Sequence, residues 1–181
     1  ALPILSMGVN KNKAPQVWQE ARWTYQSPLG PMIMIGREGT LTDLYFRGEE
    51  GPCDIGLIPL VHLPVFRVTE AWLDGYFGGR STDFLQAPPY ELYGTDFQKA
   101  VWAYIETIPY GQMMTYGAIA KALAKDLGRP KMSAQAVGGA TGANPISLIV
   151  PCHRVMGAKG AITGYGGGLD RKAFLLERSE E

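Results

Sequence analysis

The chain has 181 residues, 46% of them hydrophobic and 19% charged, which is typical of a folded globular protein and excludes a disordered one. Its 17 basic and 17 acidic residues leave a formal net charge of +0, which neither indicates nor excludes a nucleic-acid partner. The longest apolar runs are far shorter than a membrane span and no secretory signal is visible, so we expect no membrane partner and a cytoplasmic location, or a nuclear one in a eukaryote.

The first part of the chain, residues 1–84, has the pattern of an α/β domain built on an antiparallel sheet. We expect a loose N-terminal arm of about a dozen residues. Alternating apolar residues then predict a three-stranded meander over 21–48. Apolar residues at helical spacing predict a helix over 64–77, which the glycine pair at 78–79 ends.

A proline- and aromatic-rich stretch over 85–94 is typical of a linker, and 95–181 is expected to be a second domain with a surplus of three positive charges. Thr95, Thr115 and Ser133 are each placed to cap a helix. The last of these helices consists almost wholly of small residues. Two helices with a short break between them are the layout of a helix-turn-helix.

The apolar run from Ile146 to Val150 predicts a buried strand that ends at Pro151, because proline cannot continue an inner strand. Cys152 follows directly. A lone cysteine in an apolar run is most often a buried structural residue. Here two cationic side chains come next, and such neighbours lower the pKa of a thiol into the physiological range. The pattern therefore indicates a reactive cysteine.

His153 and Arg154 each have a structural and a functional interpretation. His153 can be a hydrogen-bonded, half-buried side chain or a general base. Because neighbouring residues on a strand point to opposite faces, His153 can serve Cys152 only through a bend or a bridging water. Arg154 can be a partner for a thiolate or close a surface salt bridge. Two cysteines and two histidines lack zinc-ligand spacing, so we expect neither a metal nor a cofactor.

Several motifs together resemble the O6-alkylguanine-DNA alkyltransferases, the methylated-DNA–protein-cysteine methyltransferases. The resemblance is continuous from about residue 21 to 178 and keeps the order and spacing of that family. It rests on these motifs: SPLG (27–30), IPYGQ (108–112), TYG (115–117), AVGGA (136–140), NPISLIVPCHRV (144–155) and GYGGGLDRK (164–172).

The resemblance implies an N-terminal ribonuclease-H-like α/β domain and a C-terminal helix-turn-helix, winged-helix-like domain that binds DNA and carries the thiol. It implies DNA repair in which an alkyl group on guanine O6 moves to Cys152 after the base is flipped out of the duplex. O4-alkylthymine is left open as a second substrate. The thioether does not hydrolyse, so each molecule acts once. We expect a monomer.

The resemblance also assigns roles within the expected site. Cys152 would attack the alkyl carbon, and His153 would remove its proton through a water. Asn144 would connect the helix-turn-helix to the cysteine segment, and Tyr116 would donate to guanine N3. The remaining residues expected around the base are Val155, whose carbonyl reads the guanine amino group with that of Cys152, and the pocket residues Tyr165, Gly166, Gly167 and Thr141.

The small-residue helix is expected to enter the minor groove, since small side chains let its backbone approach DNA. Tight packing between helices is the alternative explanation for any one of these small residues. The side chains expected at the DNA are Ala134, Gln135, Gly138 and Arg154. Gln135 stands where the family usually has an arginine that fills the gap left by the flipped base.

A second departure from the family concerns the glutamate that orients the histidine. That position is Ser179 in this chain, with Glu177 and Glu180 on either side. Because of these departures, a second hypothesis stays open, in which the protein is a non-enzymatic sensor that binds alkylated DNA. Relatives of that type lack the cysteine, so Cys152 argues against this hypothesis. A cysteine hydrolase that uses Cys152 and His153 is the third alternative. Their adjacency and the helix-turn-helix layout argue against it.

Overall fold

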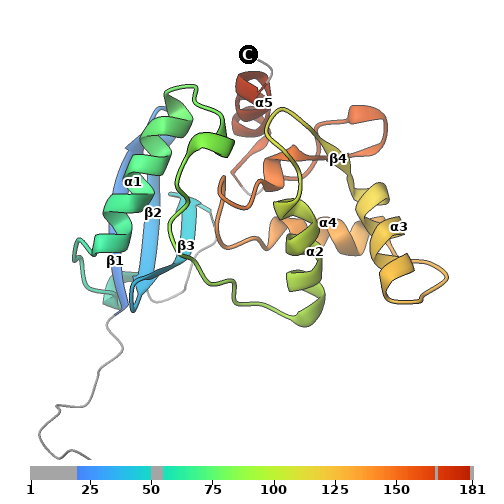
Figure 1. Ribbon diagram of the computed structural model, residues 1–181, viewed down its shortest axis with the longest axis horizontal. Coiled ribbons are helices and arrows are strands. Elements are labelled where there is room, and N and C mark those ends of the chain that lie inside the picture. The colour runs from blue at the N-terminus through green and yellow to red at the C-terminus, as the bar shows by residue number, and fades with distance from the viewer. Residues whose placement is uncertain (1–19, 50–54, 166, 180–181) are drawn as a thin grey trace, which may run out of the picture.

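A small antiparallel sheet and a helical half lie side by side in the computed structural model, which describes residues 20–49, 55–165 and 167–179 (Figure 1). The expected N-terminal arm lies outside the described residues. The predicted α/β fold class is confirmed: the sheet and its covering helix come first in the chain, and the helical half follows.

The sheet has the order β1 (Glu20–Ser27), β2 (Gly30–Arg37) and β3 (Thr40–Phe46), with both pairs antiparallel, as the meander predicts. Helix α1 (Pro64–Phe77) covers one face, and a 3-10 turn, η1 (Ile55–Leu57), follows β3. Residues of β2 are buried on both faces because a smaller apolar cluster, which contains Ile58, packs on the other side. The central strand β2 is therefore covered on both of its faces.

The stretch predicted as a linker runs along β3. The Leu41 amide donates to the Pro89 carbonyl at 2.8 Å, and the Glu91 amide donates to the Leu41 carbonyl at 3.0 Å. A 3-10 turn, η2 (Thr82–Phe84), precedes this extended segment. The segment is thus fixed by backbone hydrogen bonds, while the division of the chain into domains at 84 and 95 stays a prediction.

The helical half contains α2 (Asp96–Glu106), α3 (Tyr116–Asp126) and α4 (Ala134–Gly142). All three predicted N-caps are confirmed, because Thr95, Thr115 and Ser133 each accept a hydrogen bond from an amide in the first turn of their helix. Thr95 and Gln98 form a complete capping box. Inside, the Trp102 indole donates to the Ala140 carbonyl at 2.8 Å and joins α2 to α4.

The expected buried strand over 146–150 is wrong. These residues form a turn held by isolated bridges, with Leu148 at a φ of 70°. Cys152 then begins a 3-10 helix, η3 (Cys152–Arg154), and the chain becomes extended only at β5 (Val155–Met156), which pairs in parallel with β4 (Met114–Thr115). An apolar run shows burial but not the backbone conformation, and here the turn is what is buried. The chain ends with η4 (Ala158–Gly160) and α5 (Leu169–Ser179).

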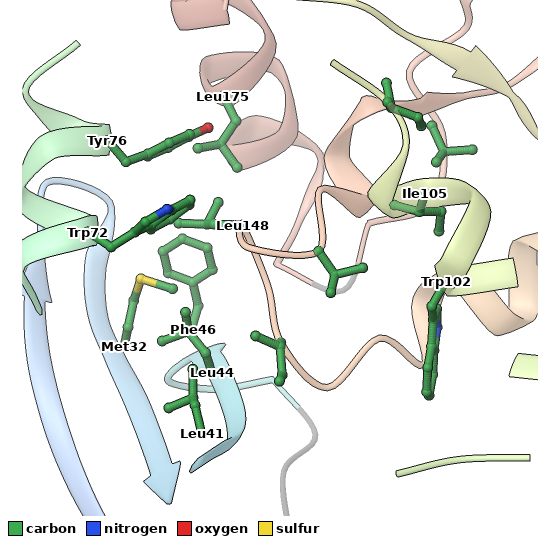
Figure 2. Packing of buried hydrophobic residues seen from close by; sticks show 14 of the residues in the cluster. Met32, Leu41, Leu44, Phe46, Trp72, Tyr76, Trp102, Ile105, Leu148 and Leu175 are labelled. Carbon is green, nitrogen blue, oxygen red and sulfur yellow. The ribbon is translucent and has the colours of Figure 1, made fainter. Parts of the chain in front are cut away.

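One hydrophobic core extends across both halves. The Leu44 amide donates to the Pro145 carbonyl at 2.9 Å, and the Ser147 amide donates to the Leu44 carbonyl at 2.7 Å, so the turn before Cys152 is attached to β3. Figure 2 shows side chains of this core from the sheet, from α1 and from the turn, including Phe46, Trp72 and Leu148. The cysteine segment therefore has a position fixed by the sheet.

Among the residues that the structure describes, no helix is both long and apolar enough to cross a membrane.

We predict that Leu44→Ala lowers the free energy of unfolding by about 2–5 kcal/mol, because Leu44 is fully buried at the junction of the two halves. Urea unfolding followed by tryptophan fluorescence and by circular dichroism is the measurement, and both signals should shift together. Leu57→Ala is the control, since that side chain is 83% exposed and its loss should change stability by less than about 0.5 kcal/mol. If the two variants lost the same free energy of unfolding, the two halves would not share a core at Leu44.

Candidate functional site

Cys152 lies at the start of η3 with only 5% of its surface exposed. Burial raises the pKa of its thiol to about 11, and the charge of Glu49 acts in the same direction. A hydrogen bond from Asn144 and the charge of Lys172 act against this rise. The resting thiol is therefore neutral at physiological pH, which differs from the lowered pKa that the sequence predicts.

Asn144 holds the turn that leads to the thiol. Its side-chain amide donates to the Val150 carbonyl at 2.9 Å and to the Ile146 carbonyl at 3.3 Å, and its Oδ1 accepts from the Ile146 amide at 3.0 Å. Asn144 lies two residues after the last residue of α4, beyond the C-cap Ala143. Its hydrogen bonds thus shape the turn before Cys152, while the bridging role that the resemblance implies stays a prediction.

His153 is fully buried and faces α1. Its Nε2 lies 3.4 Å from the hydroxyl of Tyr76, while Nδ1 has no hydrogen-bond partner among the described residues. Burial lowers the pKa of His153 to about 3, and the charges of Arg154 and Lys172 contribute. The ring is thus neutral in the resting protein, and its low pKa makes it a weak base there. Sequence reasoning placed Tyr76 only in the apolar stripe of a helix, and no local signal connects it to His153.

The prediction that Arg154 contacts DNA is wrong. Only 3% of Arg154 is exposed, its guanidinium donates to the Ile108 carbonyl at 2.8 Å, and it lies 5.5 Å from the centre of the Tyr110 ring. Arg154 therefore ties η3 to the segment after α2. It is also not among the groups that shift the pKa of the Cys152 thiol.

Lys172 is the cation of the site, and sequence reasoning missed its role. It is fully buried on α5, and its Nζ donates to the carbonyls of Val155 and Thr163 and lies 3.5 Å from the Tyr116 hydroxyl. Burial lowers its pKa, while Cys152 raises it. The GYGGGLDRK motif contained this lysine, but only the fold brings it to Tyr116. The Val155 carbonyl, expected to face the base, already accepts this hydrogen bond.

A cavity of about 10 Å³ adjoins the thiol. Its lining contains the expected residues Thr141, Tyr165 and Gly167, and in addition Glu49 from the segment after β3. The Tyr165 hydroxyl is buried without a hydrogen-bond partner among the described residues. Gly166, also expected here, lies outside the described residues. The space holds about one water molecule, so a base can enter only if the lining moves.

A groove of about 630 Å³ lies between α3, α4 and the segment after η4. Gln135 is exposed in it, and the Tyr116 hydroxyl donates to the carbonyls of Thr163 and Gly164 at 3.0 Å. Gly164 lines both this groove and the cavity beside Cys152. The residues that line the groove are Thr115, Tyr116, Gly117, Ala134, Gln135, Gly138, Gly139, Ala158, Thr163 and Gly164.

The glycines of α4 face open space. A Cβ on Gly138 would meet nothing nearer than a Tyr116 ring carbon at 3.9 Å, and a Cβ on Gly139 would meet no described atom within 4 Å. Tight packing between helices, the alternative explanation for these small residues, therefore does not require glycine at either position. Because Gly138 and Gly139 have no side chains, the groove that they line stays accessible from solvent.

Basic side chains flank this groove. Lys121 and Lys125 of α3 and Arg129 and Lys131 of the connection to α4 line a neighbouring pocket of about 320 Å³. Phosphate oxygens are the groups that such a cluster attracts. Within the described part of the chain, no three His, Cys, Asp or Glu side chains gather where a metal ion could be held.

Comparison with known proteins gives consistent matches. A sequence model described as 6-O-methylguanine DNA methyltransferase, DNA binding domain, matches residues 96–181. The methylated-DNA–protein-cysteine methyltransferase of Mycobacterium leprae is 45% identical over 152 residues, which cover 83% of this chain and 87% of that protein. Its counterpart in Methanosarcina acetivorans is 43% identical, with 84% and 94% covered.

A solved structure has a similar fold. The crystal structure of Mycobacterium tuberculosis OGT in complex with DNA superimposes with a TM-score of 0.75 at 40% identity, covering 88% of this chain and 92% of that one.

We predict that the buried neutral His153 makes the protein less stable as the pH falls. The folded pKa of about 3 lies below the ordinary 6.5, so the unfolded chain binds the extra proton and stability is lost between these two values. The loss contributed by this one group is at most about 1.4 kcal/mol per pH unit. Urea unfolding of the wild type and His153→Gln between about pH 4 and 7 measures it, and the variant should show the shallower dependence. Parallel curves would contradict the buried neutral ring.

Proposed function

The chain belongs to the family of methylated-DNA–protein-cysteine methyltransferases, DNA repair enzymes that act by alkyl transfer, and we propose that Cys152 is the residue that accepts the alkyl group. The observation that carries this proposal is that the groove adjoins the cavity beside Cys152. The open groove and the closed cavity beside the thiol share Gly164, with Tyr116 in the groove next to it. A base that leaves a duplex lying in the groove would therefore pass Tyr116 and reach Cys152.

The proposed partner is double-stranded DNA that contains O6-alkylguanine, bound through its minor groove by a single copy of the protein. The exposed backbone of α4 at Gly138 and Ala134 can approach the floor of a narrow groove because no large side chain projects there. Lys121 and Lys125 would lie near phosphates and supply attraction that does not depend on sequence. Gln135 would fill the gap that the flipped base leaves.

In the proposed reaction, Sγ of Cys152 bonds to the alkyl carbon while the bond from that carbon to guanine O6 breaks. The electron pair moves into the ring, and a proton from Tyr116 would reach N3. The thiol proton would pass through a water to His153, whose ring is neutral before the guanine arrives. Lys172 beside the Tyr116 hydroxyl favours the phenolate that this step leaves. The thioether is not hydrolysed, so each molecule acts once.

The carbonyls of Cys152 and Val155 are proposed to read the guanine amino group, and Thr141, Tyr165 and the glycines after it are proposed to surround the ring. The second lone pair of the Val155 carbonyl remains for this contact, since Lys172 uses one. No role is assigned to Glu177, and Glu180 lies outside the described residues. The side chain that contacts His153 is instead Tyr76, whose hydroxyl lies 3.4 Å from Nε2 of the histidine.

We predict that the protein gains the mass of one methyl group when it is incubated with a duplex that contains O6-methylguanine. Intact-mass measurement and peptide mapping should place the methyl on Cys152. Cys152→Ala should gain nothing, and Cys53→Ser, the matched control at the other cysteine, should behave as the wild type. Tight binding without any mass change would instead indicate a lesion sensor, and more than one turnover would indicate a hydrolase.

We predict that Gln135→Arg speeds repair of duplex DNA by roughly three- to tenfold, because a guanidinium adds a charge-assisted hydrogen bond in the gap left by the base. Single-turnover rates on a duplex with O6-methylguanine measure this. Free O6-methylguanine base is the control substrate, since it needs no flipping, and its rate should not change. An unchanged or slower duplex rate would show that Gln135 does not occupy the gap.

A further inference from the structure

Glu49 comes from the sheet half of the protein yet lines the cavity beside Cys152. Its amide donates to the Phe46 carbonyl at 3.1 Å, in the tight turn that follows β3. Its Oε1 is buried and has no hydrogen-bond partner among the described residues. A Cβ on Gly167 would lie 2.6 Å from this oxygen, so the carboxyl packs closely against the backbone at Gly167. The carboxyl thus forms a wall of the cavity.

The charged and titratable groups around Glu49 come from four elements, of which β3 contributes Tyr45, whose pKa the charge of Glu49 helps to raise. Cys152 faces it from η3 and Tyr165 from the segment before α5, since the charge of Glu49 raises the pKa of both. Arg171 of α5 is the cation whose charge acts on Glu49. Its guanidinium is engaged elsewhere, because it donates to the Leu29 and Gly167 carbonyls and lies 4.5 Å from the centre of the Phe46 ring.

Resting on the proposed role of Cys152 as alkyl acceptor, we propose that Glu49 is a specificity-determining residue: its carboxylate opposes formation of the Cys152 thiolate and so protects the thiol from electrophiles that arrive without a flipped base. Like charges in a poorly hydrated cavity repel each other strongly. Glu49 and Cys152 line the same small space, and no described donor neutralises the inner oxygen of Glu49.

The protection operates in the pH range where it is needed. Burial raises the pKa of Glu49 to about 7, so the carboxylate forms at and above neutral pH, before the thiol with its pKa of about 11 ionises. An electrophile from solution reacts with a thiolate that already exists. The flipped base does not depend on one, because the thiol proton leaves toward His153 during the attack. Because each molecule acts once, a thiol that reacts with the flipped base but not with electrophiles from solution is not used up without repairing DNA.

The test compares Glu49→Gln with the parent protein, both carrying Cys53→Ser so that Cys152 is the one thiol in the chain. The probe is iodoacetamide, with which Sγ forms a bond to the methylene carbon, iodide leaves and the thiol proton goes to water. We expect the variant to react at least about threefold faster at mildly alkaline pH, which corresponds to a fall of about half a unit in the pKa of the thiol. The ratio of the iodoacetamide rate to the single-turnover rate on O6-methylguanine duplex should therefore rise in the variant.

Two further variants separate charge from shape. Glu49→Asp keeps the charge and should react like the parent, whereas Glu49→Ala removes the charge and should react faster. Glu91→Gln is the matched control, an exposed glutamate away from the cavity, and should change nothing. Equal rates for Glu49→Gln and the parent, or equal responses of the Asp and Ala variants, would overturn the proposal.

The two proposals can fail separately. If the parent protein gains no methyl from the duplex, the proposed function of Cys152 fails, while the iodoacetamide rates still report on Glu49. If Glu49→Gln does not fold, the comparison of the Asp and Ala variants decides between charge and shape. Urea unfolding curves show which variants are folded, and only folded variants are compared.

Discussion

The attachment of the cysteine segment to β3 is the constraint on which the site depends. Two backbone hydrogen bonds at Leu44 hold the Pro145–Ser147 stretch beside the sheet, and Leu148 then packs into the shared core. Only this arrangement brings His153 against Tyr76 of α1 and the thiol against Glu49. The helical half presents the groove, but the sheet half fixes the chemistry of the thiol behind it.

Burial then sets the protonation states. The same poorly hydrated interior raises the pKa of Cys152 and lowers that of His153, so both groups rest in their neutral forms. In the proposed reaction, the neutral thiol therefore attacks only as its proton leaves toward His153, when the flipped guanine arrives. The buried ammonium of Lys172 opposes the rise in the Cys152 pKa but adds to the fall in the His153 pKa. It also keeps a positive charge close to Tyr116, where the proposed reaction places negative charge.

Local sequence signals predicted the parts of the fold that local physics decides. The caps at Thr95, Thr115 and Ser133 satisfy free amides within their own helices, and the meander follows from alternation. The turn at Leu148 was missed because burial hides it, since an apolar run looks alike in a strand and in a buried turn. Arg154, Lys172 and Glu49 were misplaced or missed because their partners lie far away in the sequence and only tertiary packing brings them together.

The presence of Glu49 in the cavity has a practical consequence for protein engineering. The matched DNA-binding region begins at residue 96, so a mutagenesis library confined to it would vary the groove, the cysteine and the loop around it, yet leave one wall of the cavity unchanged. Variants selected from such a library would all inherit the same carboxyl beside the thiol. A library meant to widen the range of accepted alkyl groups should therefore also include the turn after β3, about one hundred residues before the cysteine in the chain.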